Sequence, residues 1–231
     1  MCGARVLVPG ATGEIGAALV ARLHSLGARP ALAGRDPDAL AAVQAACADA
    51  PARTFDAWDL DACAQTVTWA AGELGGLDGV VVCVGIGAFG PAEEMTDAVA
   101  EYLVGVNALA PMAFLRAAAP RVADGGVLAA VTGVVAEAAP ARMADYAAAK
   151  AALATWLTAV RREQRRRGVS VLEINLPHMD TRFAERAVQG EAPRLPPGLP
   201  VEQAVDAVVR ALAENARFVR PGANAPLEVV R

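Results

Sequence analysis

Gly10-Ala-Thr-Gly13-Glu-Ile-Gly16 follows the short apolar run Arg5-Val-Leu-Val-Pro9 and precedes a helix-like segment, residues 17–26. This order predicts a strand, a glycine turn and a helix. Glycines spaced three residues apart let the backbone turn tightly and approach a pyrophosphate, while the free N–H groups and the dipole of the helix receive the phosphates. Three glycines alone are a weak signal, but here the strand before them and the helix after them supply the context of a dinucleotide site. We expect cofactor contacts from Gly10, Thr12, Gly13, Glu14, Ile15 and Gly16.

Strand-like and helix-like segments alternate along the rest of the chain. Residues 78–84 form a nearly continuous β-branched run, which is typical of a strand buried on both faces of a parallel sheet. The alternation predicts an α/β fold, with one domain over residues 1–231 built on a doubly wound, mainly parallel sheet with helices on both faces. Further strands are expected at residues 29–35, 53–56, 127–132, 169–175 and 227–230, and helices at residues 37–48, 61–72, 96–121, 143–167 and 201–215.

A long proline-rich connection, residues 176–200, follows the sixth predicted strand. Connections of this length inside a compact domain are more often functional loops than linkers. Because it leaves the end of a sheet strand, we expect this segment to be a loop that binds the substrate.

The composition argues against several other classes of protein. The 231 residues are 55% hydrophobic, but no run of about 18 uninterrupted apolar residues predicts a membrane span. The chain enters a strand without a signal peptide, so we expect a cytoplasmic protein. The net charge is −4, and the arginine cluster in residues 161–167 is interrupted by Glu163 and Gln164, which is typical of a solvated helix end rather than a nucleic-acid site. The four cysteines and two histidines are scattered, so neither a disulfide framework nor a metal site is expected.

Tyr146-Ala-Ala-Ala-Lys150 places a phenol and an ammonium on one face of a predicted helix, because residues four apart are neighbours there. Lys150 is the only lysine among 21 basic residues, and Tyr146 is one of two tyrosines. A lysine ammonium is compact, carries three donors and can depress the pKa of a nearby phenol. The pair therefore indicates a catalytic site, and the alternative is a chance pair on the surface.

The end of the second strand carries the signals for cofactor choice. An acidic residue there would bind the ribose 2′-hydroxyl of NAD, whereas Gly34 and Arg35 offer space and a cation for the 2′-phosphate of NADP. We therefore expect NADP in preference to NAD. Asp36 could serve NAD instead, or it could cap the helix that begins beside it. Asp59 and Leu60 are expected at the adenine edge, although capping and packing at a helix start would also account for this stretch.

Two further features lie where the reacting end of a cofactor would be. The stretch Gly85-Ile-Gly-Ala-Phe-Gly90 opens a loop at the carboxyl end of the fourth strand, where doubly wound sheets place ligands. Asn107 is a polar exception among apolar helix residues, and an amide in such surroundings is costly unless it is hydrogen-bonded. Asn107 therefore either bridges to the backbone or holds a water in the active site.

Taken in their order along the chain, these motifs resemble the short-chain dehydrogenase/reductase family over essentially its full length. The resemblance implies a Rossmann-like fold and an NADP-dependent oxidoreductase. It implies that Tyr146 is the proton donor, that Lys150 lowers the pKa of the phenol and holds the nicotinamide ribose, and that Asn107 anchors a water leading toward Lys150. Gly85 and Pro177 would also contact the cofactor.

The sequence departs from the family pattern at the catalytic serine. Thirteen residues before Tyr146, where the family usually has this serine, the chain has Gly133. Thr132 could supply the hydroxyl if the loop shifts by one residue, His178 could donate to the substrate carbonyl, or the substrate could bring its own hydroxyl. The alternatives are that Thr132 caps the strand end and that His178 is a loop residue without a catalytic duty.

Two other departures change the scaffold. The family's Asn-Asn-Ala-Gly motif is replaced by Val82-Cys-Val-Gly85, which removes side-chain hydrogen bonds between neighbouring strands. Glu14 stands where many members carry glycine, so its carboxylate is expected to point away from the pyrophosphate. Members of the family commonly associate through two long helices, and residues 97–120 and 145–165 carry small-residue faces here. We therefore expect a homodimer or homotetramer, unless those faces lie in the chain's own core.

Three functions remain open at this point. The first is an NADP(H)-dependent ketoreductase that transfers hydride to a bulky, largely apolar ketone, with Tyr146 as proton donor. The second is isomerisation, dehydration or ring rearrangement without net redox chemistry, and the third is dinucleotide binding without turnover. The substrate pocket is expected to be walled by Phe89, Val134, Val135, Arg142, Met143, Met179 and Phe183.

Overall fold

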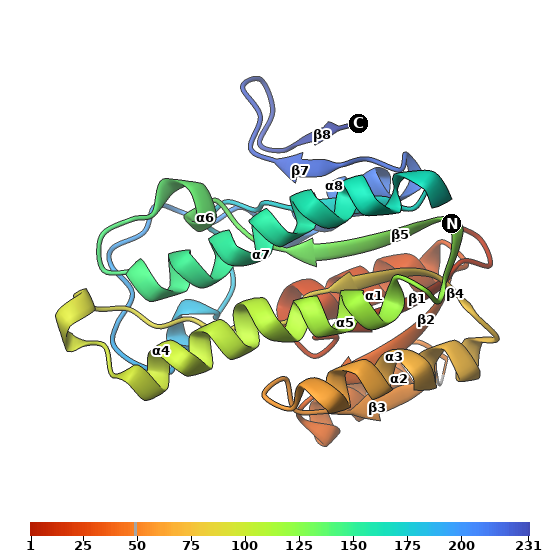
Figure 1. Ribbon diagram of the computed structural model, residues 1–231, viewed down its shortest axis with the longest axis horizontal. Coiled ribbons are helices and arrows are strands. Elements are labelled where there is room, and N and C mark those ends of the chain that lie inside the picture. Colours follow the sequence, from red (N-terminus) through yellow and green to blue (C-terminus); the bar gives the residue numbers. More distant parts are fainter. Residues whose placement is uncertain (49) are drawn as a thin grey trace.

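The computed structural model describes residues 1–48 and 50–231, and it shows a single sheet with helices on both faces (Figure 1). The eight strands follow the order β3-β2-β1-β4-β5-β6-β7-β8, and every neighbouring pair is parallel except β7 with β8. The predicted doubly wound, mainly parallel α/β fold is therefore confirmed. The strands are β1 (Arg5–Pro9), β2 (Arg29–Gly34), β3 (Ala52–Thr54), β4 (Leu77–Val82), β5 (Val122–Val131), β6 (Ser170–Ile174), β7 (Phe218–Arg220) and β8 (Glu228–Val230).

The helices divide between the two faces of the sheet, and each face has its own apolar core. The side chains of Leu7 and Val8 illustrate the division, because neighbours on a strand point to opposite faces and both are fully buried here. One core contains residues of α1, α2 and α8, and the other contains residues of α3, α5 and α7. The helices are α1 (Glu14–Ser25), α2 (Pro37–Ala45), α3 (Leu60–Leu74), α4 (Asp97–Val104), α5 (Ala110–Ala118), α6 (Val135–Ala138), α7 (Ala144–Glu163) and α8 (Val201–Ala213).

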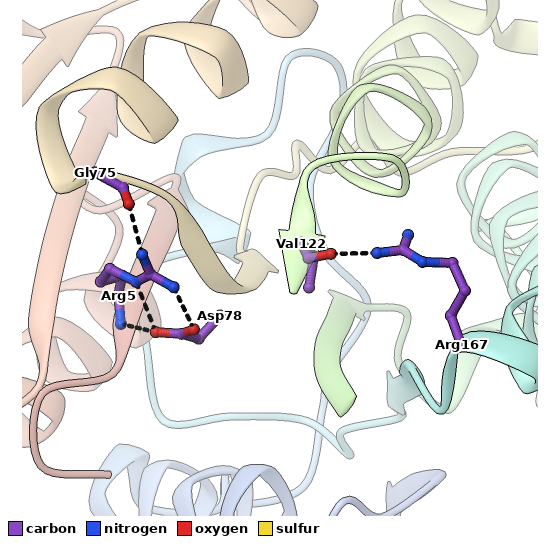
Figure 2. A network of polar contacts seen from close by, with 5 residues as sticks. All are labelled: Arg5, Gly75, Asp78, Val122 and Arg167. Atoms are coloured by element: carbon purple, nitrogen blue, oxygen red, sulfur yellow. Dashed lines mark hydrogen bonds and ion pairs between the residues drawn. The ribbon is translucent and has the colours of Figure 1, made fainter. Parts of the chain in front are cut away.

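Two arginines fasten the end of the sheet that lies opposite the carboxyl ends of the strands. Arg5 at the start of β1 binds both carboxylate oxygens of Asp78 on β4, with Nε and Nη2 at 3.0 and 2.7 Å, and donates to the carbonyl of Gly75. Arg167 donates to the carbonyl of Val122 at the start of β5 (Figure 2). These contacts hold the strand starts in place.

The long predicted helix 96–121 is interrupted by a π-helical turn. This turn, η2 (Gly105–Leu109), joins α4 to α5 and contains Asn107. In a regular α-helix the carbonyl of Asn107 would accept from the residue four places on, but that residue is Pro111, which has no N–H. π-Helical turns of this kind often occur at functional sites.

By length and composition the helix Asp97–Ala118 could cross a membrane, but 56% of its most apolar window is buried inside the fold. Much of its apolar surface thus packs against the protein itself. The core helix of a water-soluble protein has the same properties.

Most predicted elements are found, with shifted ends. The last turn of the predicted helix 143–167 is a 3-10 helix, Gln164–Arg167, and Gly168 closes it in the left-handed conformation with φ of 64°. Strand β5 begins at Val122, five residues before its predicted start. Strand β7 was not predicted, because its three residues show no alternation that could identify a strand.

Candidate active site

A cleft of about 730 Å³ lies at the carboxyl ends of the strands. Its walls come from the glycine turn, the end of β2, the loop after β4, α4, the loop after β5, the start of α7 and the loop after β6. Twelve of the fifteen site residues predicted from the sequence line this cleft, and Asn107, Asp59 and Leu60 do not. Open α/β sheets bind ligands in this position.

The glycine turn has the geometry of a phosphate cradle. Gly10 has φ of 85°, and a side chain there would have its Cβ 2.7 Å from the backbone of Cys83. At Gly16 a Cβ would collide with the carbonyl of Gly10. Gly13 is the N-cap residue of α1 and provides no side-chain cap, so the first N–H groups of the helix are left for another acceptor. This arrangement fits the pyrophosphate of a dinucleotide.

Two charged residues, Arg35 and Asp36, line the cleft at the end of β2. Asp36 accepts hydrogen bonds from the backbone N–H groups of Asp38 and Ala39, at 2.9 and 3.1 Å, and thereby caps α2. Arg35 lines the cleft, with Nη1 3.5 Å from the hydroxyl of Tyr102 on α4. The structure therefore contains the capping role weighed for Asp36, and the Arg35 guanidinium lies at the cleft beside it.

The pair expected at the adenine edge, Asp59 and Leu60, lies outside the cleft. Asp59 is the N-cap of α3 and accepts from the N–H of Ala62 at 2.9 Å, and neither Asp59 nor Leu60 lines the cleft. Asp56 and Ala57 line it instead. Strand β3 ends at Thr54, so the residues that directly follow the strand face the cleft and Asp59 already belongs to the helix. Counting from the strand end would have identified this pair.

Asn107 is fully buried and bridges two segments. Its Oδ1 accepts from the N–H of Ile86 at 3.1 Å, and its Nδ2 donates to the carbonyl of Ile86 at 3.0 Å. A Cβ placed on Gly85 would lie 3.2 Å from Asn107 Oδ1 and 3.4 Å from Lys150 Nζ. The side-chain amide thus serves as the backbone bridge considered above, and it brings the loop after β4 against Lys150.

Tyr146 and Lys150 both line the cleft from the first turns of α7. The Lys150 ammonium donates to the carbonyl of Val131 at 3.0 Å, and burial lowers its pKa to about 8. Burial also raises the pKa of Tyr146 above its usual value. Desolvation of the phenol thus acts against the expected depression of its pKa by Lys150.

The structure also resolves what stands at the position of the missing serine. Gly133 has φ of 105°, a conformation that residues with side chains rarely adopt. Thr132 is 1% exposed, and its hydroxyl donates to Glu173 Oε1 at 3.1 Å. Thr132 also lines the cleft, but in this structure its hydroxyl is engaged on the side of β6. His178 lines the cleft, as does Pro177.

Most of the residues expected to wall the substrate pocket line the cleft, and Arg142 is the exception. Arg142 is exposed and does not line the cleft; its carbonyl accepts from the N–H of Gly90. The Phe183 ring lies 5.9 Å from the Tyr146 ring, centroid to centroid. Sequence reasoning missed several cleft residues that carry no motif of their own: Tyr102, Thr181, Arg182, Arg186, Val188 and Leu195.

Glu14 lies at the first position of α1 and faces the loop after β6. Its carboxylate accepts from the N–H of Arg182 and lies 3.5 Å from the side chains of both Arg182 and Arg186. The carboxylate is therefore directed at a partner within the chain. No sequence signal marks this contact, because the residues are 168 positions apart.

Known proteins share both the sequence pattern and the fold. A family model described as short chain dehydrogenase matches residues 4–192. The chain is similar to BdcA in its crystal structure with NADPH, at 27% identity and a TM-score of 0.81, over 92% of this chain and 88% of that one. It is similar to a short chain dehydrogenase from Burkholderia cenocepacia in complex with NADP, at 26% identity and a TM-score of 0.82, over 97% and 99%. A short-chain dehydrogenase/reductase from Serratia marcescens shows 25% identity and a TM-score of 0.81, over 91% of each chain.

Curated proteins provide no match. The family match nevertheless covers most of the chain, including the glycine turn, the Asn107 bridge and the pair Tyr146 and Lys150. The chain therefore belongs to the short-chain dehydrogenase family of oxidoreductases.

Proposed function

We propose that this protein is an NADP(H)-dependent ketoreductase that reduces a bulky, largely apolar ketone. The observation that carries the proposal is the position of Tyr146 and Lys150 at a cleft whose other walls are largely apolar. Those walls include Phe89, Val135 and Met143, all of them mostly buried. Apolar surroundings favour an uncharged substrate whose carbonyl is its main polar group.

Preference for NADP is supported by the end of β2. Arg35 offers a guanidinium where the adenosine ribose would lie, and Asp36 is held as a helix cap. A guanidinium pairs well with a phosphate, whereas the ribose of NAD is usually bound by a free carboxylate. Two of the similar structures contain NADPH or NADP.

The glycine turn, Arg35, Asp56 and Lys150 would hold the cofactor, which supplies a hydride for the carbonyl carbon. Tyr146 donates its phenolic proton to the carbonyl oxygen, so the ketone gains one hydride and one proton and becomes an alcohol. At neutral pH the raised pKa of Tyr146 keeps the phenol protonated, which suits a proton donor. Lys150 is cationic below about pH 8 and stabilises the phenolate that remains.

Orientation of the carbonyl requires a donor other than Thr132. His178 is the remaining one of the two protein candidates, and it lines the cleft after β6. We propose His178, or a hydroxyl of the substrate itself, in this role. A His178→Ala variant that loses activity only toward ketones without a neighbouring hydroxyl would separate these two donors.

The test follows NADPH absorbance with a panel of cyclic and aryl ketones. We expect NADPH consumption matched by alcohol formation, and a loss of about 100-fold or more in Tyr146→Phe, whose NADPH affinity stays measurable. Substrate conversion at constant NADPH absorbance would favour isomerisation, dehydration or ring rearrangement. Full function in Tyr146→Phe would favour a dinucleotide-binding protein without turnover.

We also propose a homodimer or homotetramer that uses α4, η2 and α7. Support comes from Val104 and Leu109, which are apolar and yet 39% and 43% exposed. The predicted small-residue faces are less suited to this role, since Ala108, Ala113 and Ala147 lie in the chain's own core. Light scattering measures the oligomeric mass of wild type and of Leu109→Glu, and the variant should have a lower mass. A monomeric mass for both proteins would reject the interface.

A further inference from the structure

The loop after β6 folds back onto the N-terminus of α1 and meets one carboxylate there. The N–H of Arg182 lies 3.1 and 3.2 Å from the two oxygens of Glu14. Arg182 Nε and Arg186 Nη2 each lie 3.5 Å from Oε1 of the same carboxylate. Arg186 also donates to the carbonyl of Arg182 at 3.3 Å, which keeps the two guanidinium groups together.

The position of Glu14 is unusual for electrostatic reasons. It is the first residue of α1, directly after the glycine turn that fits a pyrophosphate. A carboxylate close to a dianionic pyrophosphate would repel it unless cations stand between the two. Two guanidinium groups are present beside Glu14, and together they match the two negative charges of a pyrophosphate.

The same loop also fills the reacting end of the cleft. The Phe183 ring lies between the loop after β4 and Tyr146, because a Cβ on Gly87 would be 3.0 Å from Phe183 Cε1 and a Cβ on Gly85 3.9 Å from Cε2. A nicotinamide ring bound beside Tyr146 and Lys150 would compete with Phe183 for this space. A shift of the loop that freed it would move Phe183 and, through the adjoining Arg182, the bonds to Glu14.

We propose that Arg182 and Arg186 are ligands of the cofactor pyrophosphate. Until the cofactor binds, the Glu14 carboxylate takes the place of the pyrophosphate and holds both guanidinium groups. This inference rests on the proposed function, since it requires a dinucleotide in the cleft. On binding, the arginines exchange a carboxylate for the pyrophosphate, and the loop with Phe183 moves off the reacting end. Arginine suits this exchange, because its planar fork of donors matches both acceptors.

The test is calorimetric binding of NADPH, ADP and adenosine 2′-monophosphate to the full chain. Arg182→Gln and Arg186→Gln should each weaken NADPH and ADP about fivefold, as expected for exposed ion pairs, and leave adenosine 2′-monophosphate unchanged because it has no pyrophosphate. Arg182→Lys should recover part of the loss. Glu14→Gln should raise the affinity for NADPH and for ADP a few-fold, because a competing anion is removed.

Glu185→Gln is the matched control, since it removes a negative charge from the same loop without touching the arginine pair. It should leave both affinities within about twofold of wild type. Wild-type NADPH affinity in both arginine variants would overturn the inference, and so would weaker binding in Glu14→Gln, which would make Glu14 a simple tether of the loop. A wild-type protein that binds no NADPH would overturn the proposed function along with it, whereas NADPH binding without turnover would leave the inference standing.

Discussion

The ammonium of Lys150 on α7 donates a hydrogen bond to the carbonyl of Val131, the last residue of β5, at 3.0 Å. Lys150 is 2% exposed, so a charged group is held inside the fold where β5 leads into the loop that follows it. Burial of a cation without full compensation costs stability. The buried charge of Lys150 therefore costs the fold stability, and the proposed reaction gives a reason for its presence.

We expect Lys150→Met to stabilise the protein at pH 7 by about 1–2 kcal/mol while it abolishes reduction. The fall in pKa from 10.5 to about 8 corresponds to about 3 kcal/mol against folding, and loss of the bond to Val131 offsets part of the gain. The penalty is complete below pH 8, where folded and unfolded chains both carry the proton. The penalty fades as the pH rises from about 8 to 10.5, because in that range Lys150 keeps its proton only in the unfolded chain.

Urea unfolding of wild type and Lys150→Met at pH 7 and pH 10 measures this difference. The advantage of the variant should shrink at pH 10. A variant that is less stable than wild type at pH 7, or an advantage that does not depend on pH, would contradict the assigned burial cost.

The local signals in the sequence predicted the frame of the site well. The predicted strand, glycine turn and helix of β1 and α1 are confirmed, because the signals for all three lie in neighbouring residues. The pair Tyr146 and Lys150 shares one helix face for the same reason, since its spacing fixes the geometry once a helix forms.

Contacts between distant segments could not be predicted in this way. The carboxylate of Glu14 meets Arg182, and the Thr132 hydroxyl meets Glu173, only after the sheet has assembled. Asp59 and Leu60 were expected beside the cofactor but lie outside the cleft, because β3 is only three residues long and its end was poorly defined in the sequence. Each error thus concerns the direction of a side chain or the end of a short element.

We expect Gly133→Ser to destabilise the protein and not to improve catalysis. The Cβ itself would have room, since its nearest neighbour is 3.5 Å away, but φ of 105° strains any residue with a side chain. The cost should be about 1–2 kcal/mol. Gly133→Ala carries the same backbone cost without a hydroxyl and is the matched control. Thermal unfolding and kcat with a ketone that the wild-type protein reduces are the measurements. A Gly133→Ser variant that is as stable as wild type and tenfold faster would show that the loop still accepts the family's serine.

We expect Asn107→Ala to cost about 1–3 kcal/mol, because the N–H and carbonyl of the half-buried Ile86 both lose their partner. Asn107→Asp retains the acceptor for the N–H but places a second oxygen opposite the Ile86 carbonyl. Its stability should recover as the pH falls, since the protonated carboxyl can donate to that carbonyl. Urea unfolding at pH 7 and pH 5 tests both variants. An Asn107→Ala loss below about 0.5 kcal/mol would mean that water replaces the bridge.

We expect Arg35→Gln to weaken NADPH binding about tenfold and to leave NADH binding nearly unchanged, because a charged bond to the 2′-phosphate is lost. Asp36→Asn is the matched control, since asparagine also accepts from the N–H groups of Asp38 and Ala39 and so preserves the cap of α2. It should not raise the preference for either cofactor by more than about twofold. Dissociation constants for NADPH and NADH from quenching of intrinsic fluorescence give the ratio directly. If Asp36→Asn instead lowers NADH affinity tenfold, Asp36 binds the ribose of NAD, and the assignment of cofactor preference to Arg35 is wrong.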